Sequence, residues 1–104
     1  MRSVRVGLVG SGYIAHYHAR ALQEVAGAGV QVVCSVDREQ AEEFAKTYRI
    51  AEVVKDVNLL FGREDLQAVI LCTPNALHAP HATVFLEQGK DVLIEKPMAM
   101  SRRG

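Results

Sequence analysis

The chain has 104 residues, of which 49% are hydrophobic and 23% are charged, and twelve basic side chains balance twelve acidic ones. This composition excludes an intrinsically disordered or collagen-like chain, and the even spread of charge argues against a surface for nucleic acid or for an anionic membrane. The apolar runs are shorter than the roughly 18 residues that span a bilayer, and the first is too short for a signal peptide. Cys34 and Cys72 lie in apolar runs, as buried thiols of a reduced protein do. We therefore expect one domain, residues 1–104, in a cytoplasmic protein.

The first half of the chain alternates strand and helix. An apolar run at 4–9 predicts a buried strand. A helix is expected over 13–25, because apolar side chains recur there at helical spacing: Ile14, Tyr17, Ala21, Leu22 and Val25. The two glycines within 26–29 predict a turn. A second strand at 30–36 closes on Asp37, and a helix at 39–48 follows with an apolar face: Ala41, Phe44, Ala45 and Tyr48.

The second half repeats this alternation. A short strand is expected at 52–54, then a brief helix through 59–61 that Asp56 can cap, then a strand at 68–72, a helix at 77–88 and a strand at 91–94. Strand and helix in steady succession imply right-handed crossovers and a parallel sheet. The expected fold class is α/β: a doubly wound parallel sheet of the Rossmann type, with helices on both faces in three α/β/α layers.

A glycine-rich loop joins the first strand to the first helix. Its residues are Gly10, Ser11, Gly12, Tyr13, Ile14 and Ala15, and they match the pattern G-x-G-x-x-G/A. The first glycine permits a tight turn, the second lets the backbone approach a pyrophosphate, and the small alanine lets the helix lie close to the strand. Amide groups and the positive end of the helix dipole then face the phosphates. The alternative is a tight turn that binds nothing, and the surrounding strand and helix favour a dinucleotide.

Asp37 follows the second strand, where a carboxylate that binds the adenosine ribose is expected. Its charge would repel the 2′-phosphate of NADP, so it favours NAD. Arg38 beside it could instead pair with that phosphate or stack on adenine, which leaves NADP possible. Asp37 can also cap the next helix, and the two roles are compatible.

Polar residues follow the fourth strand in the order Cys72, Thr73, Pro74, Asn75, with His78 soon after. Ligands of open parallel sheets bind at the carboxyl ends of the strands, near the point where strand order reverses. Asn75 and His78 are therefore candidates to contact the cofactor. Asn75 could equally cap the following helix, and a histidine on a helix face often has a structural role.

The fifth strand runs into Glu95, Lys96 and Pro97. A lysine at that strand end would point toward the nicotinamide side of the crevice, where an ammonium group could polarise a substrate hydroxyl or carbonyl. The proline restricts the backbone of the lysine, and a cis bond is possible there. At a position that is not a strand end, a Lys-Pro pair is typical of a surface turn.

The histidines do not predict a metal site. His16 and His18 are two apart on a helix and face different ways. His81 follows His78 by three residues, but no carboxylate or thiolate cluster accompanies the pair.

Taken together, three motifs resemble the landmarks of the Gfo/Idh/MocA oxidoreductase family. They are the loop from Val9 to Ala15 with His18, the run from Cys72 to Asn75 with His78, and Glu95-Lys96-Pro97. The resemblance implies an NAD- or NADP-binding Rossmann domain in which Asn75 and His78 line the cofactor site. It also implies that Lys96 is the catalytic lysine contacting the reacting hydroxyl, and that a cis bond precedes Pro97. Members act on a CH–OH group of a sugar, cyclitol or related polyol.

The resemblance covers nearly the whole chain, yet family members are usually several times longer. Their catalytic histidine, substrate pocket and oligomer contacts belong to a second domain, and this sequence stops at Gly104 before it. The chain is therefore expected to bind its cofactor without turnover and to self-associate through an unpaired sheet edge. A fragment, a proteolysis product and a natural truncation all remain open. A non-catalytic nicotinamide-nucleotide sensor and a folding relic that binds nothing are the competing functional hypotheses.

Overall fold

The computed structural model describes residues 4–72 and 78–94. Strands and helices alternate along the chain. The strands are β1 (Val4–Val9), β2 (Ala28–Cys34), β3 (Glu52–Val54), β4 (Ala68–Leu71) and β5 (Asp91–Ile94). The helices are α1 (Tyr13–Gln23), α2 (Arg38–Tyr48), the short 3-10 helix η1 (Val57–Leu60) and α3 (His78–Glu87).

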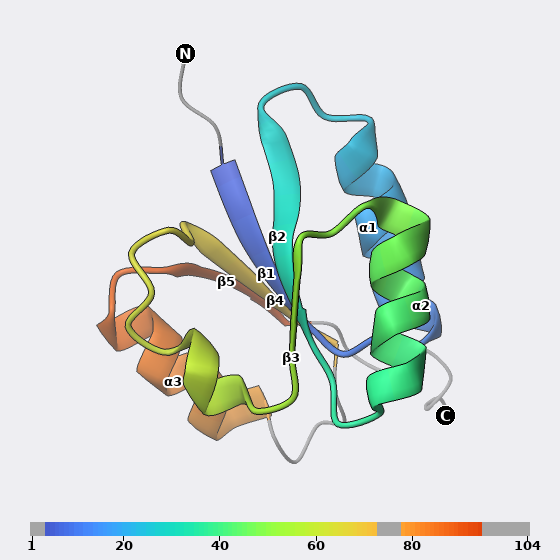
Figure 1. The fold of residues 1–104 in the computed structure, drawn as a ribbon. Helices are drawn as coiled ribbons and strands as arrows, with labels where there is room; N and C mark the ends of the chain where they lie inside the picture. Colours follow the sequence, from blue (N-terminus) through green and yellow to red (C-terminus); the bar gives the residue numbers. More distant parts are fainter. Residues whose placement is uncertain (1–3, 73–77, 95–104) are drawn as a thin grey trace, which may run out of the picture.

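Within the described residues the strands form one parallel sheet in the order β3-β2-β1-β4-β5. The chain builds outward from β1 to β3, crosses back, and continues on the other side with β4 and β5. Helices α1 and α2 lie together on one face of the sheet, and α3 and η1 lie on the other (Figure 1). This is the doubly wound, three-layer α/β/α arrangement that the sequence predicts.

The core is divided between the two faces of the sheet. Under α1 and α2, Phe44 packs with β1 and β2 side chains such as Leu8 and Val33. Under α3, Phe85 packs with Val69 and other residues of the central strands. Such alternation follows from the strand period of two, which sends successive side chains to opposite faces.

Cys34 belongs to this second layer and is 4% exposed. Burial, with a smaller effect from the charge of Asp56, raises the pKa of its thiol to about 11. The thiol is therefore protonated at neutral pH and serves as an apolar core residue, as predicted.

The predicted apolar stripe of the first helix is mostly wrong, although its member Leu22 does pack against the core. Tyr17 is 67% exposed and Val25 52% exposed, and the helix ends at Gln23. The residues of α1 that are buried against the sheet are Ala15 and Ala19. Small side chains occupy the sheet-facing side of α1 because they allow the helix axis to approach the strands closely.

The second strand lies two residues earlier than the predicted range of 30–36. It begins at Ala28, because Val4 and Arg5 of β1 pair with Ala28 and Gly29. Val36 is outside the strand and 93% exposed. Gly29 was expected in the turn, but pairing with β1 holds it in extended conformation.

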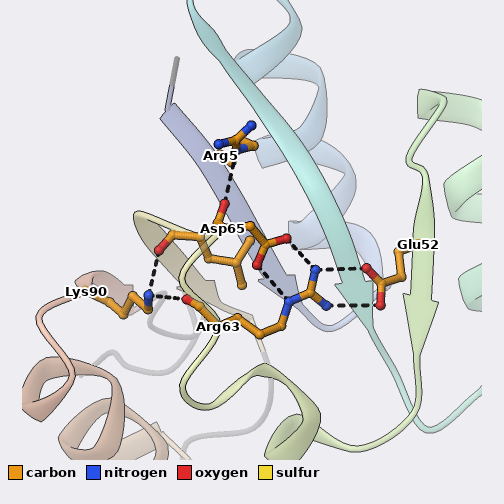
Figure 2. A network of polar contacts seen from close by, with 6 residues as sticks. Arg5, Glu52, Arg63, Asp65 and Lys90 are labelled. Atoms are coloured by element: carbon orange, nitrogen blue, oxygen red, sulfur yellow. Dashed lines mark hydrogen bonds and ion pairs between the residues drawn. The ribbon is translucent and has the colours of Figure 1, made fainter. Parts of the chain in front are cut away.

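A network of ion pairs fixes the amino edge of the sheet, where the strands begin. Arg63 forms bidentate hydrogen bonds with Glu52 at 2.9 and 3.0 Å and with Asp65 at 2.6 and 2.9 Å (Figure 2). Lys90 donates to the carbonyls of Arg63 and Leu66, and Arg5 donates to that of Asp65. Hydrogen bonds from Arg63 hold the pKa of the Asp65 carboxyl below its ordinary value of 3.8. The network ties the starts of β1, β3, β4 and β5 together.

Candidate functional site

The carboxyl ends of all five described strands lie in one row. Val9 pairs with Cys34 and Leu71, Cys34 pairs with Val54, and Leu71 pairs with Ile94. The segments that follow the strands therefore leave the sheet along a common edge, opposite the ion-pair network. Order reverses at β1, which has β2 on one side and β4 on the other, so the crevice expected for a ligand begins at the end of β1.

Gly10 makes the turn off β1. Its amide donates to the carbonyl of Cys34 at 2.6 Å, and its φ is +112°, a conformation that L side chains rarely adopt. A Cβ at Gly10 would also lie only 3.3 Å from Cys72 at the end of β4. Glycine is thus required at this position by backbone conformation and by the neighbouring strand.

Gly12 has a different role, because space rather than conformation distinguishes it. It is the N-cap of α1, and it supplies no side-chain hydrogen bond to the first turn. A Cβ built on Gly12 would meet no atom of the described chain within 4 Å. The amides of the first helical turn have no partners within the helix, so an anion can approach them directly over Gly12.

These features fit the pyrophosphate of a dinucleotide. The loop offers backbone N–H donors, the positive end of a helix dipole and open space above a glycine. Ser11 does not point into that space, since its side chain is 3% exposed and bonds inward to Ser35 and Gln40. Its contribution to a ligand therefore comes from its backbone. Ile14 is half-buried on α1, and Tyr13 begins that helix.

Asp37 lies at the end of β2, at the same edge. It is the N-cap of α2, and its Oδ1 accepts a hydrogen bond from the amide of Gln40 at 3.0 Å. The side chain is exposed, so its second oxygen can accept from a ribose hydroxyl. The capping role predicted as an alternative for Asp37 is confirmed, and it fixes the carboxylate in place.

Arg38 lines a shallow depression beside Asp37, with Ser35, Glu42 and Lys55 among the other lining residues. Its Nε donates to Glu42 at 2.8 Å across one helical turn, and its side chain is 82% exposed. The guanidinium is thus partly neutralised by a carboxylate of its own helix. The depression therefore contains the carboxylate of Glu42 as well as two cations, Arg38 and Lys55.

Sequence reasoning missed Gln40, Ser35 and Lys55. Gln40 had a readable signal, because Asp37 and Gln40 have the spacing of a capping box, in which the third residue after the cap reaches back with its side chain. Ser35 and Lys55 directly follow β2 and β3, but no pattern in the sequence singles them out.

Several predicted site residues lie outside the described residues: Thr73, Pro74, Asn75, Glu95, Lys96 and Pro97. His78 is the first residue of α3, but its side chain is also outside the description. Cys72 is half-buried at the end of β4, where its amide donates to the carbonyl of Val9 at 2.9 Å. The structure thus brings Gly10, Gly12, Asp37 and Cys72 to one edge, and the cofactor-binding roles of these and of the other predicted site residues stay predictions.

Within residues 4–72 and 78–94, no group of three or more histidine, cysteine or acidic residues could hold a metal ion. His16 instead packs between α1 and α2, with its Nδ1 2.8 Å from the hydroxyl of Tyr48. Among the helices of residues 4–72 and 78–94, none has the length and apolar character to cross a membrane.

Comparison with known proteins agrees with this geometry. The model of the Gfo/Idh/MocA group, described as an oxidoreductase family with an NAD-binding Rossmann fold, matches residues 4–103. Inositol 2-dehydrogenase of Acidothermus cellulolyticus is 38% identical over 104 residues, which are 99% of this chain and 30% of that protein. An NADP-dependent scyllo-inositol 2-dehydrogenase of Bacillus subtilis is 29% identical, with 96% and 30% covered.

A solved structure gives the same result. Scyllo-inositol dehydrogenase from Lactobacillus casei, with bound NAD(H) and scyllo-inositol, superposes with a TM-score of 0.84 at 26% identity, over 96% of this chain and 30% of that one. The chain therefore spans about 30% of the length of these relatives.

Proposed function

Because the chain belongs to the Gfo/Idh/MocA oxidoreductase family with its NAD-binding Rossmann fold, we propose that residues 1–104 form the cofactor-binding domain of a dehydrogenase. The substrate class is a cyclitol, sugar or related polyol, oxidised at one CH–OH group. The names of the inositol dehydrogenases among its relatives support this class.

One observation carries the proposal. The uncapped start of α1, open above Gly12, lies at the same sheet edge as the exposed carboxylate of Asp37. Ser11 of the loop and Ser35, two residues before Asp37, are in hydrogen-bond contact at 2.9 Å. An anion site and a ribose acceptor joined in this way suit the two ends of an ADP moiety.

The residues divide the work of binding. Amides around Gly12 hold the pyrophosphate, and Asp37 accepts from the adenosine ribose. Asp37 and the pairing of Arg38 with Glu42 both disfavour a 2′-phosphate, which makes NAD the preferred cofactor. Bound NAD supplies the hydride acceptor for alcohol oxidation.

Lys96 is proposed to act on the substrate. Its ammonium group would hydrogen-bond the oxygen of the reacting hydroxyl and polarise it. Asn75 and His78 would line the cofactor between the end of β4 and α3. These roles rest on the motif positions in the sequence.

Calorimetric titration with NAD and with NADP tests the proposal. We expect micromolar binding of NAD. Asp37→Ala should raise the Kd of NAD by about tenfold, because it removes charge-assisted hydrogen bonds to a ribose. The same change should raise the Kd of NADP less, because it also removes a negative charge that repels the 2′-phosphate. Absence of binding to either dinucleotide would refute the proposal.

We further propose a cytoplasmic, homo-oligomeric protein. Support for association comes from β5, which pairs with β4 alone among the described strands and leaves Leu93 and Ile94 47% and 40% exposed. Sedimentation of the chain and of Leu93→Lys tests this. The variant should shift the chain toward monomer, and a wild-type chain that is monomeric at high concentration contradicts association.

A further inference from the structure

Four residues at the proposed cofactor site form a closed ring of hydrogen bonds. Ser11 Oγ lies 2.7 Å from Gln40 Oε1 and 2.9 Å from Ser35 Oγ. Ser35 Oγ accepts from the amide of Asp37 at 3.2 Å, and Asp37 Oδ1 accepts from the amide of Gln40 at 3.0 Å. The ring thus runs from the glycine-rich loop through the end of β2 into the first turn of α2 and back.

The protons of this ring can be assigned. A serine hydroxyl has one proton, and an amide carbonyl oxygen can only accept. Ser11 therefore donates to Gln40, and Ser35 donates to Ser11 while accepting from the amide of Asp37. Both serine hydroxyls are hydrogen-bonded in this arrangement, which matters most for Ser11, the buried polar residue among the described residues.

The side chain of Gln40 departs from its usual local role. In a capping box the residue three after the cap bonds back to the amide of the cap residue. Here Ser35 Oγ already accepts the hydrogen bond from the amide of Asp37. The Gln40 side chain instead accepts from Ser11, 29 positions earlier in the chain. A local helix cap has thereby become a link between two loops.

We infer that Gln40 is a positioning residue, which sets the phosphate loop and the ribose carboxylate at a fixed separation. This rests on the function proposed above. Its backbone holds Asp37, its side chain holds Ser11, and no direct contact with the dinucleotide is required. The two halves of an ADP moiety then meet a site already in register, so less ordering remains to be done on binding.

The side-chain link can be cut without removing the cap. Gln40→Ala abolishes the acceptor for Ser11 but keeps the backbone amide that Asp37 caps, and Gln40→Met does the same at similar side-chain length. The Kd of ADP-ribose, which engages both loops, should rise about three- to tenfold in each variant, the effect of one net hydrogen bond. The Kd of adenosine, which engages the Asp37 side alone, should change less than about twofold.

Gln23→Ala is the matched control, since Gln23 is an exposed glutamine at the far end of α1. It should change the Kd of neither ADP-ribose nor adenosine. The double variant Ser11→Ala/Gln40→Ala should bind ADP-ribose no more weakly than the weaker single variant, because both remove one shared bond. Additive losses, equal weakening of adenosine and ADP-ribose, or unchanged ADP-ribose binding would overturn the inference and leave the proposed function standing. A wild-type chain that binds no ADP-ribose would overturn both.

Discussion

The two edges of the sheet are built in different ways. At the amino edge, charged side chains from distant segments bond to each other, and Arg63 is the centre of the network. At the carboxyl edge, the glycine-rich loop presents backbone, α1 begins without a side-chain cap, and Ser11 and Gln40 bond inward. One edge satisfies its polar groups internally, and the other leaves donors and an acceptor for a ligand.

This contrast separates stability from binding. Changes at the amino edge should lower the free energy of unfolding with no effect on ligand affinity beyond unfolding itself. Changes to the exposed binding groups at the carboxyl edge should lower ligand affinity with little effect on the free energy of unfolding.

The largest effect is expected from Arg63→Met, which keeps the apolar stem and removes both bidentate pairs. Arg63 is 21% exposed and faces two carboxylates that the change leaves unpaired. The free energy of unfolding should therefore fall by about 2 kcal/mol, a value between those typical of exposed and of buried ion pairs. Arg38→Met is the control, because its single pair is largely exposed. Equal urea midpoints for the two variants would contradict the assignment of Arg63.

Gly12→Ala should separate binding from folding. Its added Cβ meets no atom of the described residues within 4 Å, so stability should change by less than about 1 kcal/mol, while the Kd of NAD rises at least about tenfold because the methyl group occupies the approach to the amides. Gly29→Ala, at the amino end of β2 and also unobstructed, should leave the Kd unchanged. If Gly12→Ala binds NAD normally, the pyrophosphate does not lie over this loop.

The contribution of Asp65 should depend on pH. Its folded-state pKa lies below the ordinary 3.8 because Arg63 bonds to it, so the stabilisation is complete above that value and is lost as pH falls through the folded pKa. Asp65→Asn should therefore cost roughly 1 kcal/mol at pH 7, a modest value for a partly exposed pair, and much less near pH 2. Urea unfolding of both proteins across this range measures it, and a difference independent of pH would contradict the pairing.

The smallest effect is expected from Glu42→Gln at the rim of the depression beside Asp37. Releasing Arg38 from its partner should improve NADP binding about two- to threefold, as expected for an exposed ion pair, and leave NAD unchanged. Glu43→Gln, on the same helix, is the control. Equal changes in the affinities of NAD and NADP would show that Glu42 has no part in cofactor choice.

The sequence allowed the order of elements to be predicted, because buried parallel strands are continuous apolar runs bounded by glycine and polar residues. It also located Gly10, Gly12 and Asp37, whose types are dictated by local backbone and capping requirements. The buried face of α1 was predicted wrongly, since alanine spacing carries less signal than Tyr17 or Val25, and only the closeness of the helix to the sheet selects Ala15 and Ala19.

Contacts between segments far apart could not be predicted. The bond from Ser11 to Gln40 and those from Arg63 to Glu52 depend on which loops share a sheet edge. That proximity is set by the register of the strands, which no single segment encodes.

The most direct test of the central claim is titration of the ¹⁵N-labelled chain with NAD while backbone amide shifts are recorded. We expect the largest changes at residues 11–15 and 35–38, and no change in the amide shifts of residues 63–67 and 90–92 at the opposite edge. Changes centred on the amino edge, or spread evenly over the sheet, would contradict a dinucleotide site at the carboxyl ends of the strands.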